Sequence, residues 1–243
     1  MAQPESPLLI DVREISKDYR GLRPLRIARL TVAQAERVSI IGLDAVAAEV
    51  FVNLLTGATL PDRGDIHILG RSTAAITDGT DWLATVDRFG IVSERVVLLD
   101  GMTVAQNLAV PFTLELEPLA ESTRQEVERL ADEVGLPADT LSGTVRETSG
   151  EVRLRVRLAR ALALAPAILL LEQPGTSLAT LARGEFGTLL ARLAERRRLA
   201  MLTFTADRNL ATAIGGRRLV WNPATGALLP DTLWSRWAAS RSG

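Results

Sequence analysis

The sequence contains no cysteine, which excludes disulfide bonds and thiolate metal sites and is typical of a protein in a reducing cytosol. It contains one lysine, Lys17, and one histidine, His67, so almost all of its positive charge is carried by arginine. The formal net charge of -1 creates no strong attraction to nucleic acid or to an anionic membrane. We therefore predict a cytoplasmic protein that does not bind nucleic acid.

Long apolar runs are also absent. The longest, residues 162–171, is about half of the roughly 20 residues that a membrane span needs. The first residues, MAQPESPLL, lack a basic region followed by an apolar run, so we predict no signal peptide. The hydrophobic fraction of 47% still supports a large core. A chain of 243 residues suits one domain, 1–243, with an inserted subdomain.

Segments with strand and helix patterns alternate along the chain. The strand patterns fall at 8–15, 24–31, 37–42, 64–70, 89–94, 167–173 and 199–204, with a hairpin at 218–230. Helical spacing appears at 45–55, where Gly57 marks the end, and at 153–164 and 181–196. This alternation predicts an α/β fold with a mainly parallel sheet.

Residues 101–147 differ in character and predict a helical subdomain insertion. Two helical stretches, 104–112 and 122–135, are separated by Pro118. We expect Ser122 to cap the second helix and Gly135 to end it. The C-terminal tail, 231–243, carries Trp234 and Trp237 at helical spacing, which favours packing of this tail onto the domain.

Several short strings occur in the order and spacing of one protein family. In chain order they are SIIG (39–42), LLTG (54–57), PDRGDIHILG (61–70), LLDGMTVAQNLAVPF (98–112), and SG (149–150) followed by RVRLARAL and AILLLEQP. Over residues 8–230 the chain resembles the ATP-binding cassette of ABC transporters. The resemblance implies a P-loop NTPase-like fold with an antiparallel β subdomain and a helical insertion. It also implies ATP and Mg²⁺ as ligands.

The family resemblance implies two protein partners. One is an integral-membrane permease, which would place this chain at the inner face of the membrane. The other is a second cassette, so that the pair would be a homodimer or a heterodimer.

The phosphate-binding loop has lost most of its family residues. A P-loop uses glycines to bring backbone amides to phosphate, a lysine on the β- and γ-phosphates and a hydroxyl on magnesium. The corresponding positions here are Gly42, Ala47, Ala48, Glu49 and Val50. Only the first glycine remains, because alanines replace the second glycine and the lysine, and glutamate replaces the hydroxyl.

Charge at this loop opposes phosphate. No lysine or arginine occurs between Arg37 and Arg63, so a shifted register cannot restore the missing cation, and Asp44 adds a second carboxylate. One charge pair at about 4 Å contributes about 4 kcal/mol at an effective dielectric of 20. Loss of this attraction and a repulsion of similar size would remove most of the roughly 8 kcal/mol behind micromolar affinity. We therefore expect weak or absent ATP binding.

The residues that the family uses for hydrolysis are also replaced. Glu172 and Gln173 occupy the positions of the magnesium aspartate and the general-base glutamate, and glutamine cannot accept a proton. Glu172 alone remains a weak metal candidate. Ala206 occupies the position of the switch histidine, Ala179 that of the D-loop aspartate, and Glu94 that of the Q-loop glutamine. The resemblance thus implies no intact catalytic residue.

The signature-like motif is partly kept. Ser149 and Gly150 match the residues that would offer donors to a γ-phosphate across a dimer, whereas Glu151 places a negative charge there. Tyr19 matches the aromatic residue that stacks on adenine in the family. It is equally compatible with a tyrosine that covers the end of a strand.

Other polar residues have structural interpretations. His67 lies in a strand pattern and is interpreted as a sheet residue. The arginines of 153–160 are interpreted as a solvated helix face. The run 196–198 is interpreted as a helix C-terminus whose charge complements the macrodipole.

Three functions remain open at this stage. The first is a pseudo-ATPase cassette with a structural or regulatory role beside a permease. The second is an atypical ABC ATPase that still binds or slowly hydrolyses ATP to drive transport. The third is a scaffold on the same fold without a role in transport.

Overall fold

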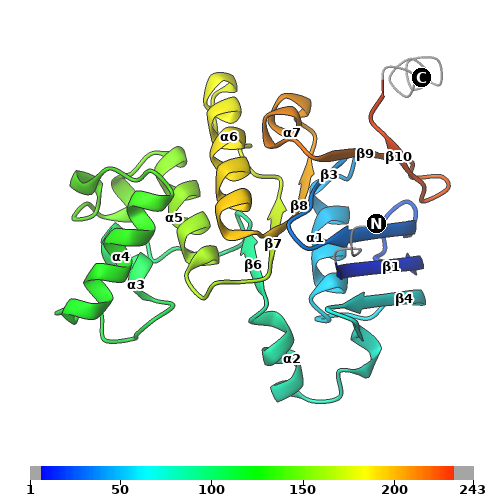
Figure 1. The fold of residues 1–243 in the computed structure, drawn as a ribbon, viewed down its shortest axis with the longest axis horizontal. Coiled ribbons are helices and arrows are strands. Elements are labelled where there is room, and N and C mark those ends of the chain that lie inside the picture. The colour runs from blue at the N-terminus through cyan, green and yellow to red at the C-terminus, as the bar shows by residue number, and fades with distance from the viewer. Residues whose placement is uncertain (1–6, 233–243) are drawn as a thin grey trace, which may run out of the picture.

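A computed structural model of the chain describes residues 7–232, which form two sheets and the helices around them (Figure 1). The strands are β1 (Leu8–Lys17), β2 (Leu25–Ala33), β3 (Arg37–Ile41), β4 (Arg63–Ile68), β5 (Arg71–Ser72), β6 (Phe89–Val92), β7 (Ile168–Glu172), β8 (Ala200–Thr205), β9 (Arg217–Trp221) and β10 (Leu228–Pro230). The α-helices are α1 (Ala45–Leu55), α2 (Gly79–Val86), α3 (Val104–Ala109), α4 (Glu121–Glu133), α5 (Gly150–Leu162), α6 (Thr180–Arg197) and α7 (Arg208–Ile214). Short 3₁₀ turns lie at Thr73–Ala75, Ala138–Thr140 and Val145–Glu147.

The larger sheet has the order β10-β9-β3-β8-β7-β6, and its pairs are parallel except for the β10–β9 hairpin. The smaller sheet has the order β2-β1-β4-β5 and is antiparallel. The prediction of an α/β fold with a mainly parallel sheet and an antiparallel β part is therefore confirmed.

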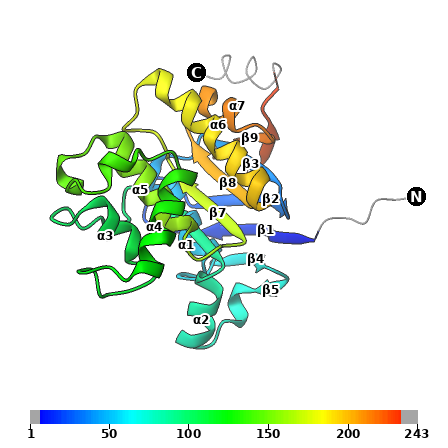
Figure 2. The same ribbon diagram turned by 60° about the vertical axis from the view of Figure 1, so that its left-hand side comes forward.

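Both faces of the larger sheet are covered. Along β7, Leu169 and Leu171 pack in one hydrophobic cluster, with residues of α5 and α6, because alternate side chains of a strand point to opposite faces. Ile168 and Leu170 pack in the other cluster, with α1 and the antiparallel sheet. The turned view shows α6 and the helices α3 to α5 on one side of the strands (Figure 2).

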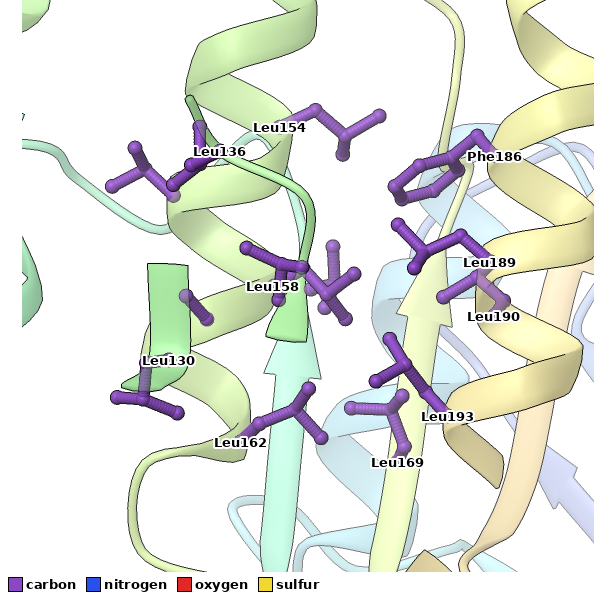
Figure 3. Packing of buried hydrophobic residues seen from close by; sticks show 14 of the residues in the cluster. Leu130, Leu136, Leu154, Leu158, Leu162, Leu169, Phe186, Leu189, Leu190 and Leu193 are labelled. Carbon is purple, nitrogen blue, oxygen red and sulfur yellow. The ribbon is translucent and has the colours of Figure 1, made fainter. Parts of the chain in front are cut away.

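The cluster around α5 shows why this segment is helical. Leu154, Leu158 and Leu162 recur every four residues and therefore lie on one face of the helix. They point toward Phe186 and Leu193 of α6, with β7 between the two helices (Figure 3). Burial of each of these large side chains contributes about 1.5–3 kcal/mol, so this contact holds α5 against the sheet.

Most predicted elements are present near their predicted bounds, including the hairpin, in which Leu228 pairs with Trp221. The prediction that Ser122 caps α4 is wrong, because the helix already begins at Glu121 and its N-cap, Ala120, makes no side-chain cap hydrogen bond. Gly135 does follow the end of that helix, with a positive φ of 70°. The short helices α2 and α7 were not predicted. Trp234 and Trp237 lie outside the described residues.

The interpretation of the α5 arginines as a solvated face is wrong for three of them. Arg155 donates to the carbonyl of Val134, Arg157 to that of Val96 and Arg160 to that of Val97. Burial lowers the pKa of both Arg157 and Arg160. These side chains therefore fix neighbouring loops to the helix. His67 lies in β4, which agrees with its interpretation as a sheet residue, and it pairs with Asp11 of β1.

None of the helices in residues 7–232 combines the length and the apolar character that a membrane span requires.

Candidate functional site

The candidate site lies where three parallel strands end. The carboxyl ends of β3, β6 and β7 lead into residues 42–44, 93–95 and 172–173, and crevices at this edge of a parallel sheet are the usual ligand sites of α/β proteins. A cavity of about 570 Å³ opens there. Its charged lining residues are Asp44, Glu49, Glu94, Arg95 and Glu172.

The first turn of α1 uses a side chain of the protein as its cap. One carboxylate oxygen of Asp44 accepts a hydrogen bond from the amide of Ala47 at 2.7 Å, and the Asp44 carbonyl accepts from the amide of Ala48 at 2.9 Å. The side chains of Ala47 and Ala48 are fully buried, and Val50 packs against the same core. Free amides and the dipole at a helix N-terminus attract anions, and here a carboxylate already occupies that position.

Arg95 joins two carboxylates across the cavity. Its Nη1 lies 3.2 Å from Oε1 of Glu49, while Nε and Nη2 donate to the two oxygens of Glu172 at 3.1 and 2.6 Å. The Glu172 side chain is only 8% exposed, whereas that of Arg95 is 42% exposed. The hydrogen bond to Glu172 raises the pKa of the Arg95 guanidinium above its ordinary value. Glu172, the metal candidate, is thus bound bidentately by an arginine.

Sequence reasoning missed Arg95, because it considered only cations near the P-loop in sequence, between Arg37 and Arg63. The cation comes from the end of a different strand. Val92 of β6 pairs with Leu171 of β7 in parallel register, so the residues that follow Val92 lie beside Glu172. The alignment of these two strand ends, both recognisable in the sequence, is the signal that could have found the contact.

The other family positions at this edge make structural contacts. Gln173 donates through Nε2 to the carbonyl of Leu43 at 2.9 Å, and its backbone has a φ of 46°, which is rare for a residue with a side chain. Glu94 accepts a hydrogen bond from the Thr176 hydroxyl at 3.0 Å. Ala206 lines the cavity with a methyl group. These contacts tie the loops at the strand ends to one another.

The signature-like residues lie at the start of α5 and are not among the residues that line this cavity. Ser149 is the N-cap of α5 and accepts from the amide of Val152 at 3.3 Å, and Gly150 is the first helical residue. Glu151 forms an ion pair with Arg155 at 2.9 Å. Within one chain, therefore, the structure does not bring these residues to the P-loop position.

Tyr19 follows the end of β1 in the antiparallel sheet. Its ring is partly buried and packs against the core that contains α1. Burial raises the pKa of its hydroxyl, and the nearby negative charge of Asp44 adds to this effect. The effect of Asp44 shows that Tyr19 lies near the loop, but Tyr19 is not among the residues that line the cavity, and its stacking on adenine stays a prediction.

Comparison with known proteins defines the class. A family model described as "ABC transporter" matches residues 25–176, more than half of the chain, and the chain therefore belongs to the ABC transporter family. The methionine import ATP-binding protein MetN of Brucella abortus is 29% identical over 213 residues, which are 87% of this chain and 57% of that protein. The sulfate/thiosulfate import ATP-binding protein CysA of Pseudomonas syringae pv. tomato is 31% identical over 220 residues, 88% of this chain and 64% of that protein. The chain thus spans 57–64% of the length of these relatives.

Solved structures give the same fold. The dimeric bacterial ABC transporter cassette MJ0796 superimposes with a TM-score of 0.74 at 23% identity, over 90% of this chain and 96% of that one. CbiO1 from Clostridium perfringens, part of the ABC transporter complex cbiONQ, superimposes with a TM-score of 0.79 at 17% identity, over 98% and 94%. The predicted ABC-cassette fold is confirmed.

Proposed function

We propose that the chain is a cytoplasmic cassette subunit of an ABC transporter that neither binds Mg²⁺-ATP tightly nor hydrolyses it. The observation that carries this proposal is the ion-pair network Glu49–Arg95–Glu172. In a P-loop protein, the residues that correspond to Glu49 and Glu172 of this chain hold magnesium. Here both carboxylates already bind a guanidinium, and Asp44 caps the amide of Ala47. The residues present therefore do not fit a magnesium-bound phosphate.

Hydrolysis also lacks its proton acceptor. A general base must lie within reach of the attacking water and must be able to accept its proton. At position 173 an amide replaces the carboxylate, and that amide donates to the Leu43 carbonyl. At position 206 a methyl group replaces an imidazole. The two carboxylates of the network do not supply these functions, because Glu49 and Glu172 are both paired with Arg95.

The proposed role is structural or regulatory, beside an integral-membrane permease and a second cassette. We assign to the permease the surface formed by residues 94–112, which lead into and begin the helical segment 101–147 of the single domain 1–243. The apolar side chains of Val97 and Leu99 support this assignment, since they are 75% and 37% exposed. Contact with the permease would place the chain at the inner face of the membrane.

Calorimetric titration of the full chain with Mg²⁺-ATP, with phosphate release followed in the same sample, tests the proposal. We expect neither binding heat nor phosphate release at millimolar nucleotide. A cassette with an intact P-loop, measured in the same buffer, serves as the positive control. Micromolar binding without turnover would make ATP a structural ligand and contradict the electrostatic argument. Turnover that is lost on changing Glu172 to Gln would contradict the pseudo-ATPase assignment itself.

A further inference from the structure

The two acidic residues that converge on Arg95 occupy particular positions of the P-loop fold. Glu49 occupies the hydroxyl position of the loop, and Glu172 ends the strand that carries the second acidic motif. In proteins with this fold, these two positions jointly hold one magnesium ion. The two side chains still converge in this chain, but they converge on a guanidinium, at 3.2 Å and 2.6 Å.

The geometry of Arg95 suits this position. Its planar fork binds Glu172 through two parallel hydrogen bonds and presents the remaining terminal nitrogen to Glu49. Burial of a charged carboxylate is costly unless a positive group pairs with it, and Arg95 supplies that group to the nearly buried Glu172. The anion position beside it is occupied as well, because Asp44 caps the first turn of α1. Arg95 thus corresponds to the magnesium cation of a bound magnesium phosphate, and the Asp44 carboxylate corresponds to its anion.

The backbone around Arg95 is held in place from several sides. The Arg95 amide donates to the Ser93 hydroxyl at 3.1 Å, and Glu94 accepts from Thr176. Arg157 and Arg160 of α5 donate to the carbonyls of Val96 and Val97 at 3.1 and 2.9 Å. Arg95 therefore does not lie on a free loop, and its side chain starts from a fixed point at the cavity wall.

We propose that the guanidinium of Arg95 binds Glu49 and Glu172 in place of a magnesium ion and takes the position that this cation has in P-loop proteins. This inference rests on the proposed loss of nucleotide binding and supplies a cause for it. The cavity is occupied by the chain's own charges, so an external cation must compete with a guanidinium that is covalently part of the wall. Removal of the guanidinium exposes two converging carboxylates to an external divalent cation.

Manganese binding to the full chain, without nucleotide, tests this inference. The variants are Arg95→Gln, Arg95→Gln combined with Glu172→Gln, and the control Arg71→Gln, which breaks the exposed Arg71–Asp81 pair elsewhere on the surface. We expect Arg95→Gln to lower Tm and to acquire one Mn²⁺ site, seen by electron paramagnetic resonance, with a Kd of about 1 mM or below. Addition of 10 mM Mn²⁺, a concentration chosen as about ten times that Kd, then raises its Tm by about 3–6 °C. The unaltered chain, the double variant and the control acquire no Mn²⁺ site and show no rise in Tm when Mn²⁺ is added.

Each result has a defined meaning. Failure of Arg95→Gln to gain Mn²⁺ binding overturns the inference, as does equal Mn²⁺ binding by the unaltered chain. If Arg95→Gln does not fold, the double variant decides, because removal of the unpaired charge at position 172 must restore folding if Arg95 is its counter-ion. A double variant that also fails to fold overturns the inference. Nucleotide binding by the unaltered chain contradicts the proposed function instead, and the manganese experiment contains no nucleotide.

Discussion

Asp44 shows how one side chain changes the chemistry of a helix N-terminus. In the family's loop, backbone amides at the start of the helix are available to phosphate because glycines let the chain curve around it. Here the helix begins at Ala45, and the Asp44 carboxylate accepts from the Ala47 amide at 2.7 Å. The same electrostatic preference that would bind an external anion now stabilises the fold.

This cap predicts a measurable loss of stability on substitution. Asp44→Ala should lower the free energy of unfolding by about 1 kcal/mol, since a side-chain cap is replaced by a methyl group. Asp44→Asn should cost much less, because an amide oxygen can still accept from Ala47. Urea denaturation followed by circular dichroism measures both. Equal losses for the two variants would show that the contribution of Asp44 is not its cap.

The replaced residues at the site are readable from the sequence, whereas their new contacts are not. Ala48 and Glu49 follow from the position of Gly42 and from the spacing of the motif. That Arg95 meets Glu172, 77 positions later, depends on the sheet order, which places β6 beside β7. The sequence therefore predicts which family residues differ at these positions, and the structure adds which groups contact one another there.

At the scale of elements, three helix ends meet at one arginine. Arg197, in the last turn of α6, donates to the carbonyl of Leu162 at the end of α5 and forms an ion pair with Glu133 at the end of α4. The side chains of Glu133 and Arg197 are 8% and 16% exposed. The sequence-based interpretation of the arginine run as a helix C-terminus agrees with α6. It did not foresee that one member of the run links two other helices.

This contact predicts a specific dependence of stability on pH. The hydrogen bond from Arg197 lowers the pKa of Glu133 below its ordinary value of 4.5. A carboxyl whose folded-state pKa is lowered stabilises the fold above its unfolded-state pKa and loses this contribution as pH falls through the folded-state pKa. We expect the free energy of unfolding to fall below about pH 4.5, and Glu133→Gln to flatten this decline while lowering stability at pH 7. Urea titrations between pH 3 and pH 7 measure both effects, with Glu128→Gln on the exposed face of α4 as the control. A variant with the same pH slope as the unaltered chain would exclude Glu133 as the cause.

The accuracy of the element predictions follows the strength of the hydrophobic pattern. Strands β7 and β8 are buried on both faces, and their largely apolar runs identify them, although β8 also carries Thr203 and Thr205. Helix α2 has only eight residues and none of them is buried, so its apolar residues form too short a pattern to identify a helix. The arginines of α5 were misinterpreted because periodicity indicates which face is apolar, but it does not show that neighbouring loops cover the polar face.

At the scale of the whole molecule, the fold and the site have separate requirements. Structures with TM-scores of 0.74 and 0.79 share only 23% and 17% of their residues with this chain. Size and hydrophobic pattern are enough to specify the layers, since cores accept extensive substitution at constant volume and patterning. A phosphate site has no such tolerance, because it requires particular charges at particular atoms. An intact cassette fold is therefore compatible with a nucleotide site in which most of the ligating groups differ.

The same separation predicts how the chain assembles. In the family-type dimer, ATP would lie between the P-loop of one cassette and the signature motif of the other. In a homodimer of this chain, the acidic groups Asp44 and Glu49 would face Glu151 of the second copy, and like charges at such a contact oppose association. We therefore expect sedimentation velocity to give the same mass with and without millimolar Mg²⁺-ATP. The double variant Asp44→Asn, Glu49→Gln should associate more strongly than the unaltered chain at low salt, and this difference should shrink at high salt as the repulsion is screened. A nucleotide-dependent dimer of the unaltered chain would instead mean that ATP supplies contacts strong enough to overcome both the internal ion pairs and the facing carboxylates.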